Sequence, residues 1–247
     1  MRNIKLIVQY DGTNYHGWQA QTRDDTIQGR LEDAIRQMVK HDPVKCIGAS
    51  RTDAGVHAVR QVANFRIPQR MAINCTSFYY GLNSLTPDDI IITEVQEMFP
   101  EFHARFDACA KTYCYQIWNA DSGAIYHLRF SWHIRRPLNV PAMRAAARYL
   151  LGCHDFKSFQ ASSCGAETTI RTIFALHILQ HKQMLRVVIK ANAYLHRMVR
   201  NLVGTLVEVG TGRIPPEAML KILHRKDRTG AGVTAPAQGL FLLRVHY

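Results

Sequence analysis

Hydrophobic and polar positions alternate along several stretches of the chain, and this pattern predicts strands separated by amphipathic helices. The run IKLIVQY, residues 4–10, alternates as a half-buried strand does. The run TIQGRLEDAIRQMVK, residues 26–40, has apolar residues three or four apart. This spacing predicts a helix, with Thr26 as its N-cap. The other runs of the first half predict two strands, a helix and a last strand at 45–50, 57–67, 77–85 and 90–98.

The second half of the chain repeats this order of elements. Its runs predict strands at 110–119, 170–180, 183–192 and 239–247, and helices at 140–152, 195–212 and 215–227. Both halves therefore follow a β-α-β-β-α-β pattern, the split βαβ arrangement. We expect an α+β fold of two tandem split-βαβ (RRM-like) units, 1–107 and 108–247, forming one extended mixed or antiparallel sheet with helices on one face. The open face of such a sheet commonly serves as a binding surface for RNA.

Charge is distributed very unevenly between these halves. The 247-residue chain has a formal net charge of +12. Residues 1–107 contain 12 Lys and Arg against 13 Asp and Glu, whereas residues 108–247 contain 19 against 6. A field of +13 on one half attracts a polyanion. Nucleic acid is favoured over a membrane because the basic residues are scattered through folded-looking segments. A basic surface that serves only solubility is the alternative.

The remaining composition is that of a globular protein of the cytoplasm. Hydrophobic residues make up 47% of the chain, no apolar run approaches the length of a membrane span, and the first residues lack a signal-peptide pattern. The six cysteines show no C-x-x-C spacing, so we expect free thiols, most of them buried. His177 and His181 are four residues apart in a strand-like run, a spacing that does not favour a metal site.

An unusual charged motif, GASRTDAGVHAVRQVANF, occupies residues 48–65. Asp53 lies between Gly48 and Gly55, and Asp-Ala-Gly is itself a turn signal. An acid that only caps a turn is therefore one explanation. Arg51, two residues before the acid, favours a chemical role instead, because it is able to pair with a carboxylate or a phosphate.

Three further motifs combine aromatic and basic residues. The loop YDGTNYHGWQAQ spans residues 10–21, and the strand KTYCYQIW places Tyr113 and Tyr115 on one face. A tyrosine pair on a strand is also a common feature of a core. The run YLHRMVRNLVG opens the predicted helix at 195, where His196 and Arg200 are four residues apart and hence neighbours on a helix surface.

These motifs, together with FHARF and the ending APAQGLFLL, resemble the tRNA pseudouridine synthase I family, the TruA type. The resemblance is ordered along the chain from residue 10 to residue 243, and RTDAGVHA is its most specific motif. One departure is Ser50, where the family usually has glycine. If that position requires a positive φ, serine is strained there.

The resemblance implies a tRNA-modifying isomerase that flips its target base and converts uridine to pseudouridine at positions 38, 39 and 40 of the anticodon stem-loop. It implies a homodimer; from the residues and the reaction we also expect no cofactor, no metal and no membrane. Asp53 matches the family's essential aspartate and Arg200 the arginine that pairs with it. Tyr113 matches the tyrosine that stacks on the base, and Arg51 the arginine that takes the place of the flipped nucleotide. His103 and Arg105 match a segment that contacts tRNA.

Elementary chemistry is consistent with this implied reaction. The N-glycosidic bond breaks, the base turns, and C5 joins C1′, so no redox partner or group donor takes part. A carboxylate can act as a nucleophile at C1′ or at C6, or as a base at C2′. These three possibilities stay open.

Two other functions are alternatives to this reaction. A non-catalytic RNA-binding module would explain the charge and the fold but not the RTDAGVH cluster. A glycoside hydrolase requires two facing carboxylates. The basic half offers only Asp155 and Glu167 as nearby acids for that role.

Overall fold

The chain folds into two compact units in a computed structural model that describes residues 1–40, 44–123, 125–161 and 165–247. Unit 1 comprises Met1–Cys109 and Leu242–Tyr247, and unit 2 comprises Ala110–Phe241. Within the described residues the chain forms ten strands and six α-helices. The predicted α+β class is therefore confirmed.

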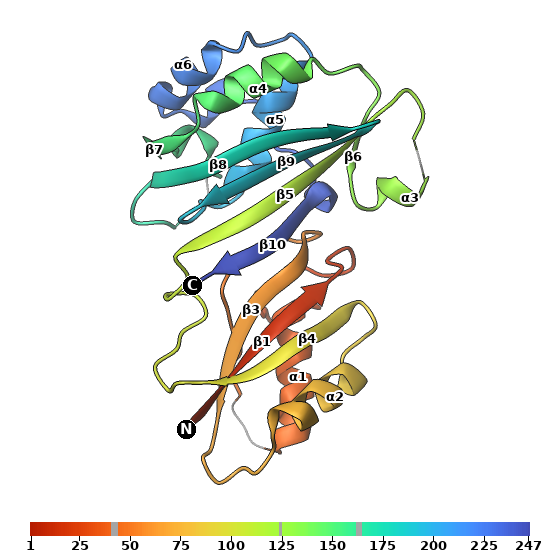
Figure 1. Ribbon diagram of the computed structural model, residues 1–247, viewed down its shortest axis with the longest axis vertical. Coiled ribbons are helices and arrows are strands. Elements are labelled where there is room, and N and C mark those ends of the chain that lie inside the picture. The colour runs from red at the N-terminus through yellow and green to blue at the C-terminus, as the bar shows by residue number, and fades with distance from the viewer. Residues whose placement is uncertain (41–43, 124, 162–164) are drawn as a thin grey trace. The chain divides into compact units, whose positions relative to one another are not determined.

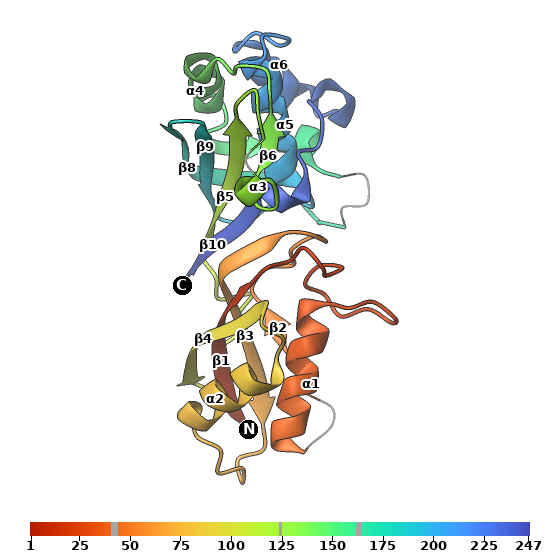
Figure 2. The same cartoon turned by 90° about the vertical axis from the view of Figure 1, so that its right-hand side faces the viewer.

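Unit 1 is a sheet with two helices packed against one of its faces (Figures 1 and 2). Its elements are β1 (Arg2–Tyr10), α1 (Ile27–Val39), β2 (Ile47–Gly48), β3 (His57–Ile67), α2 (Cys75–Leu85) and β4 (Ile90–Met98). Strand β1 is central and antiparallel to both β3 and β4, while β2 pairs with β3. On the helix-facing side, the ring of Phe65 from β3 meets that of Phe78 from α2 at 5.4 Å. Thr26 caps α1 as predicted, because its side chain accepts a hydrogen bond from Gly29 N.

The face of this sheet opposite the helices is crossed by the segment that follows β4. Asn3 Nδ2 donates to Phe102 O at 2.8 Å, and Ala104 N donates to Asn64 Oδ1 at 2.9 Å. The two asparagines also bond to each other, and both are buried. Buried amides are stabilising only when their hydrogen bonds are made. This pair therefore fixes the path of the chain between β4 and β5.

The strands of unit 2 are also covered by helices. Its elements are β5 (Ala110–Asn119), α3 (Ile125–Leu128), β6 (Trp132–Ile134), α4 (Val140–Arg148), β7 (Gly152–Asp155), β8 (Ile170–His181), β9 (Met184–Ala191), α5 (Met198–Gly210) and α6 (Ala218–Arg225). The strands lie in the order β5-β9-β8-β7, all antiparallel. Strand β6 pairs with β5 in parallel, which makes the sheet mixed. The closing strand β10 (Leu240–His246) contains the boundary between the two units.

Three short elements of unit 2 were not predicted, and three helices are shorter than predicted; one of them, α6, spans Ala218–Arg225, where 215–227 was predicted. The sequence gives no alternation for α3, β6 and β7, which have only three or four residues each. Helix α4 ends at Arg148, where 152 was predicted. Helix α5 begins at Met198, where 195 was predicted, because Arg197 has a φ of 58°. A residue in this left-handed region is outside the helix.

Five cysteines in the described residues are free, as predicted: Cys46, Cys75, Cys109, Cys114 and Cys153. Only Cys46 and Cys114 are buried, so the expectation that most would be buried is wrong for this set. Cys164 lies outside the described residues. No helix in the described part of the chain combines the length and apolar character that a membrane span requires.

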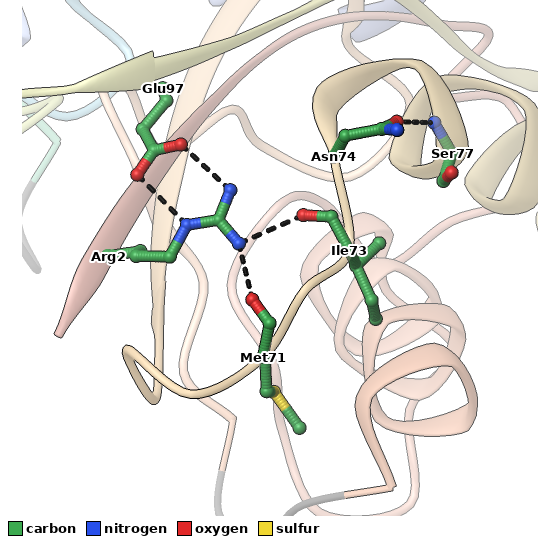
Figure 3. Close-up of polar contacts among 6 residues, drawn as sticks. All are labelled: Arg2, Met71, Ile73, Asn74, Ser77 and Glu97. Atoms are coloured by element: carbon green, nitrogen blue, oxygen red, sulfur yellow. Dashed lines mark hydrogen bonds and ion pairs between the residues drawn. The ribbon is translucent and has the colours of Figure 1, made fainter.

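Arg2 connects β1, β4 and the segment before α2 (Figure 3). Its Nε and Nη2 donate to the Glu97 carboxylate at 2.9 and 2.8 Å, and its Nη1 donates to the carbonyls of Met71 and Ile73 at 2.6 and 3.0 Å. The bidentate geometry suits a planar guanidinium. Hydrogen bonding to Arg2 holds the pKa of Glu97 below its usual range. One side chain thus fixes the approach to α2.

The N-cap of α2 offers a direct test of this local construction. Asn74 Oδ1 accepts a hydrogen bond from Ser77 N at 2.8 Å (Figure 3). We expect Asn74→Ala to lower the free energy of unfolding by about 1 kcal/mol, because an N–H of the first turn loses its acceptor. Asn74→Asp keeps an acceptor and is the matched control. Urea unfolding of both variants measures the difference, and equal stabilities would contradict the capping role.

Candidate active site

Asp53 lies in the connection between β2 and β3, and the loop that follows β1 packs across this connection. Trp18 N donates to Thr52 O at 3.0 Å, and Gly55 N donates to Tyr15 O at 3.3 Å. Val56 N closes the turn by donating to Asp53 O at 3.1 Å. These bonds join main chain to main chain. Main-chain bonds therefore contribute directly to the position of the acid.

Two glycines allow the loops to approach this closely. Gly17 has a φ of 93°, and a Cβ there would lie 2.7 Å from Thr52 O. Gly48 packs directly on the ring of Trp18, which is 1% exposed, and a Cβ would overlap that ring. Both positions therefore require glycine.

The residues of the motif alternate between inward and outward positions. Thr52 is buried, and its hydroxyl is 2.8 Å from the hydroxyl of Tyr10. Its two neighbours are more accessible: Arg51 is exposed and Asp53 is half-buried. Both candidate residues of this motif are thus accessible on a loop whose middle residue is anchored.

Ser50 fits its position without backbone strain. It is not among the described residues with a positive φ, whereas Gly55 in the same loop has a φ of 76°. Ser50 N donates to Gln61 Oε1 at 3.2 Å, and Gln61 Nε2 donates to Ser50 O at 2.7 Å. The departure from the family's usual glycine therefore leaves the motif intact.

His103 and Arg105 lie in the turn that follows β4, the segment held by Asn3 and Asn64. His103 Nδ1 accepts hydrogen bonds from Arg105 N at 3.1 Å and Phe106 N at 3.2 Å. Arg105 is exposed, and its guanidinium lies 5.8 Å from the Phe106 ring centroid. The backbone of the turn is thus fixed, and the guanidinium of Arg105 is exposed to solvent.

Tyr113 and Tyr115 on β5 have different surroundings. Tyr115 is fully buried, and its hydroxyl donates to Pro236 O at 2.7 Å, so burial raises its pKa and it belongs to the core. Tyr113 is 6% exposed, and its ring meets Tyr194 edge to face at 5.0 Å. The hydroxyl of Tyr194 is bonded to Ile189 O at 2.8 Å. Tyr113 therefore stands against a ring that is itself fixed.

Arg200 lies in the first turn of α5. Its Nε donates to Ala235 O at 2.8 Å, and Ala235 N donates to Arg200 O at 3.1 Å. A cation near a helix N-terminus is unfavourable, and this carbonyl compensates in part. His196 precedes the helix, so the predicted helical neighbourhood of His196 and Arg200 is wrong.

A strap, which we define as residues 231–236, holds Arg200 in place by lying along α5. Its backbone approaches so closely at Gly204 that a Cβ there would overlap Val233 O. Thr234 Oγ1 donates to Asn201 Oδ1 at 2.7 Å, and Gly232 N donates to Thr205 Oγ1 at 2.9 Å. A glycine in mid-helix costs stability relative to alanine. Here the glycine allows the strap to pack against α5, which places Ala235 beside Arg200.

The predicted site residues are divided between the two units. Unit 1 holds Arg51 and Asp53 on one loop and His103 and Arg105 on one turn; unit 2 holds Tyr113 and Arg200. Sequence reasoning missed Gln61, Tyr10 and the strap. The available signals were a glutamine inside an apolar strand run and a glycine inside an apolar helix run.

Metal ligation has no support in the described residues. His177 and His181 are exposed on β8, and no group of three or more His, Cys, Asp or Glu side chains in the described ranges is placed to hold an ion. Asp155, one of the two acids that the basic half offers to a glycosidase, forms an ion pair with Lys226 at 3.0 Å.

The protein thus has an α+β fold, and its candidate catalytic acid, Asp53, lies on a loop that main-chain hydrogen bonds hold in place. A model of the tRNA pseudouridine synthase family matches residues 6–107 and 146–247. Over all 247 residues, and over the full length of each relative, the chain is 45% identical to tRNA pseudouridine synthase A of Thermoanaerobacter sp. and 43% identical to that of Acetivibrio thermocellus. Among solved structures, an archaeal box H/ACA sRNP Nop10-Cbf5 complex is similar with a TM-score of 0.36 and 9% identity, covering 92% of this chain and 59% of that one.

The chain belongs to the tRNA pseudouridine synthase family. It is therefore an isomerase that converts uridine to pseudouridine in tRNA, as the resemblance implied. Of the six candidate site residues, Tyr113 alone lies outside the matched segments.

Gly204 tests the role of the strap. Gly204→Ala should gain helix propensity, yet we expect a net loss of about 1–3 kcal/mol in the free energy of unfolding, because the new methyl group overlaps the Val233 carbonyl. Activity should also fall, since Ala235 moves with the strap. The matched control is Gly81→Ala in α2, where the atoms nearest to the new methyl group belong to the flexible side chain of Met38. Thermal unfolding and pseudouridine formation are measured on both, and equal behaviour would exclude the strap's role.

Proposed function

We propose that this enzyme acts on uridines 38, 39 and 40 of the tRNA anticodon stem-loop, and that Asp53 is its essential catalytic group. The observation that carries the proposal is Asp53 itself: it is the acid of the RTDAGVHA motif, on a loop held by main-chain bonds from a second loop. A reacting carboxylate gains most from being fixed before the substrate arrives. Asp53 serves as the nucleophile or base of the isomerisation.

Arg200 supplies the counter-charge of Asp53 in this proposal. A cation within about 4–6 Å of a carboxylate favours its ionised form, and the ionised form is the one that reacts. The Nε of Arg200 is already bonded to Ala235 O. The outer nitrogens of the guanidinium have further donors for a carboxylate.

Arg51 and Tyr113 handle the RNA. A paired base is out of reach of a side chain, so the target nucleotide flips out at a cost of a few kcal/mol. Arg51, which is exposed beside the acid, takes the vacated place. Tyr113 stacks on the flipped base and keeps the detached uracil from leaving, while its ring is supported by Tyr194.

Basic residues offset the cost of base flipping by binding phosphates. Residues 108–247 carry 19 Lys and Arg against 6 Asp and Glu, and each neutralised phosphate releases counterions. His103 and Arg105 add contacts to tRNA from unit 1. The reaction uses no cofactor.

The enzyme works as a homodimer in the cytoplasm, where its substrate is. This part of the proposal rests on the family resemblance of the motifs. Light scattering on the purified chain measures its mass, and a monomer of 28.2 kDa at assay concentrations would contradict the dimer.

Replacing the acid separates chemistry from binding. We expect Asp53→Asn to abolish pseudouridine formation, measured as tritium release from C5-labelled uridine in tRNA, while tRNA binding stays nearly unchanged. The amide keeps the shape of the carboxylate but is a much weaker nucleophile and base. Asp88→Asn replaces an exposed acid of the same unit and should keep full activity. Mapping the modified nucleotides in wild-type reactions tests the positions, and normal tritium release by Asp53→Asn would sink the assignment.

The aromatic ring of Tyr113 is tested by two substitutions. Tyr113→Ala should weaken tRNA binding by about 1–3 kcal/mol, the usual value of one base-aromatic stack. Tyr113→Phe should retain most of the binding, because stacking requires the ring and not the hydroxyl. Titration of a fluorescently labelled anticodon stem-loop measures both. Loss of binding in the Phe variant would count against stacking.

A further inference from the structure

A buried glutamine lies directly behind the Asp53 loop. Gln61 is on β3, paired in register with Val8 of β1, and its exposed fraction is 0%. Its side-chain amide brackets Ser50: the oxygen accepts from Ser50 N at 3.2 Å, and the nitrogen donates to Ser50 O at 2.7 Å. Burying an amide is costly unless its hydrogen bonds are made. The two bonds to Ser50 meet that cost.

Tyr10 extends this contact to the next residue but one. Its hydroxyl is 2.8 Å from Thr52 Oγ1 and 3.5 Å from Gln61 Nε2. Ser50 and Thr52 are therefore both held from the interior by side chains of β1 and β3. Asp53 follows Thr52 directly. The side chains of Gln61 and Tyr10 therefore act on the position of its Cα through the main chain of Ser50 and Thr52.

We infer that Gln61 and Tyr10 are positioning residues that set the geometry of the Asp53 carboxylate through Ser50 and Thr52. The inference rests on the proposed role of Asp53. Neither side chain has to touch substrate: Gln61 is fully buried and Tyr10 is 3% exposed. A displacement of about 1 Å at a reacting group costs on the order of 100-fold in rate. A two-point support behind the loop therefore acts on catalysis rather than on tRNA binding.

The same unit contains a matched control for this arrangement. Asn83 on α2 brackets Ile92 in the same way, since its oxygen accepts from Ile92 N at 2.8 Å and its nitrogen donates to Ile92 O at 2.9 Å. Ile92 is on β4 and belongs to neither of the two loops of the site. Replacing either amide by leucine removes the same pair of bonds. Only Gln61→Leu removes them from the Asp53 loop.

The first experiment compares Gln61→Leu with Asn83→Leu. Both should lower the melting temperature. Gln61→Leu should lower kcat for pseudouridine formation by about 100-fold with little change in KM for tRNA, because the acid is displaced while the RNA surface is kept. Asn83→Leu should retain the wild-type kcat. Equal kcat values for the two variants at a temperature where both are folded would overturn the inference.

Two milder variants keep the test decisive if Gln61→Leu fails to fold. Tyr10→Phe removes one hydroxyl and keeps the ring beside Trp18. It should lower kcat with KM unchanged, and an unaltered kcat counts against the inference.

The second variant is Gln61→Glu. Its ionised carboxylate repels the Ser50 carbonyl oxygen, whereas the protonated form donates a hydrogen bond to it. The kcat of this variant relative to wild type should therefore rise as the pH falls from about 8 to about 6, since burial raises a carboxyl pKa. A flat ratio would contradict positioning through Ser50.

The proposed function and this inference fail in different ways. Full activity of Asp53→Asn removes the proposed function, whatever the Gln61 variants do. An inactive Asp53→Asn together with a fully active Gln61→Leu leaves the proposed function in place and removes only the positioning role. The deciding measurement is kcat from steady-state tritium release on wild type, Asp53→Asn, Gln61→Leu and Asn83→Leu, with folding of each verified by thermal unfolding.

Discussion

The hydrogen bond from Trp18 N to Thr52 O holds two loops of unit 1 together, and the construction of the Asp53 loop follows from it. Main-chain contact at this distance is possible only because Gly17 has no Cβ and adopts a positive φ. Loops are usually the mobile parts of a fold. Here the acid sits on a loop with the accessibility that a substrate needs, yet its backbone is fixed almost as in a strand.

In unit 2 a charged residue is also fixed by a close approach of two backbone segments. Arg200 is bonded at both its side chain and its carbonyl to Ala235, and the strap that carries Ala235 lies close to α5 only because residue 204 is glycine. In each unit a glycine lets one backbone approach another, and the approaching backbone fixes a charged residue. For Gly204 the cost is local stability, since glycine is unfavourable within a helix. A functional site tolerates such a loss of stability where the geometry of its residues determines the reaction rate.

Elements with a clear period were predictable from the sequence, and the exceptions have identifiable causes. Strands at 90–98 and 110–119 were predicted with the bounds that β4 and β5 show, because both runs are rich in β-branched and aromatic residues. The start of α5 was misplaced because nothing in the sequence signals the left-handed φ of Arg197. Strand β6 was missed because three residues carry no period, and its parallel pairing with β5 depends on a distant partner.

The candidate site was predictable as a set of motifs but not as a supported geometry. Asp53 and Arg51 stand out because charged residues interrupt a strand-like run, whereas Gln61 follows Arg60 and reads as one more polar position of a half-buried strand. Burial of the two methylene groups of a glutamine does not offset the cost of burying its amide without hydrogen bonds, so apolar burial does not account for its place in β3. Its two bonds to Ser50 do. Polar residues that break an apolar pattern without reaching the surface therefore indicate where a fold fixes a loop from within.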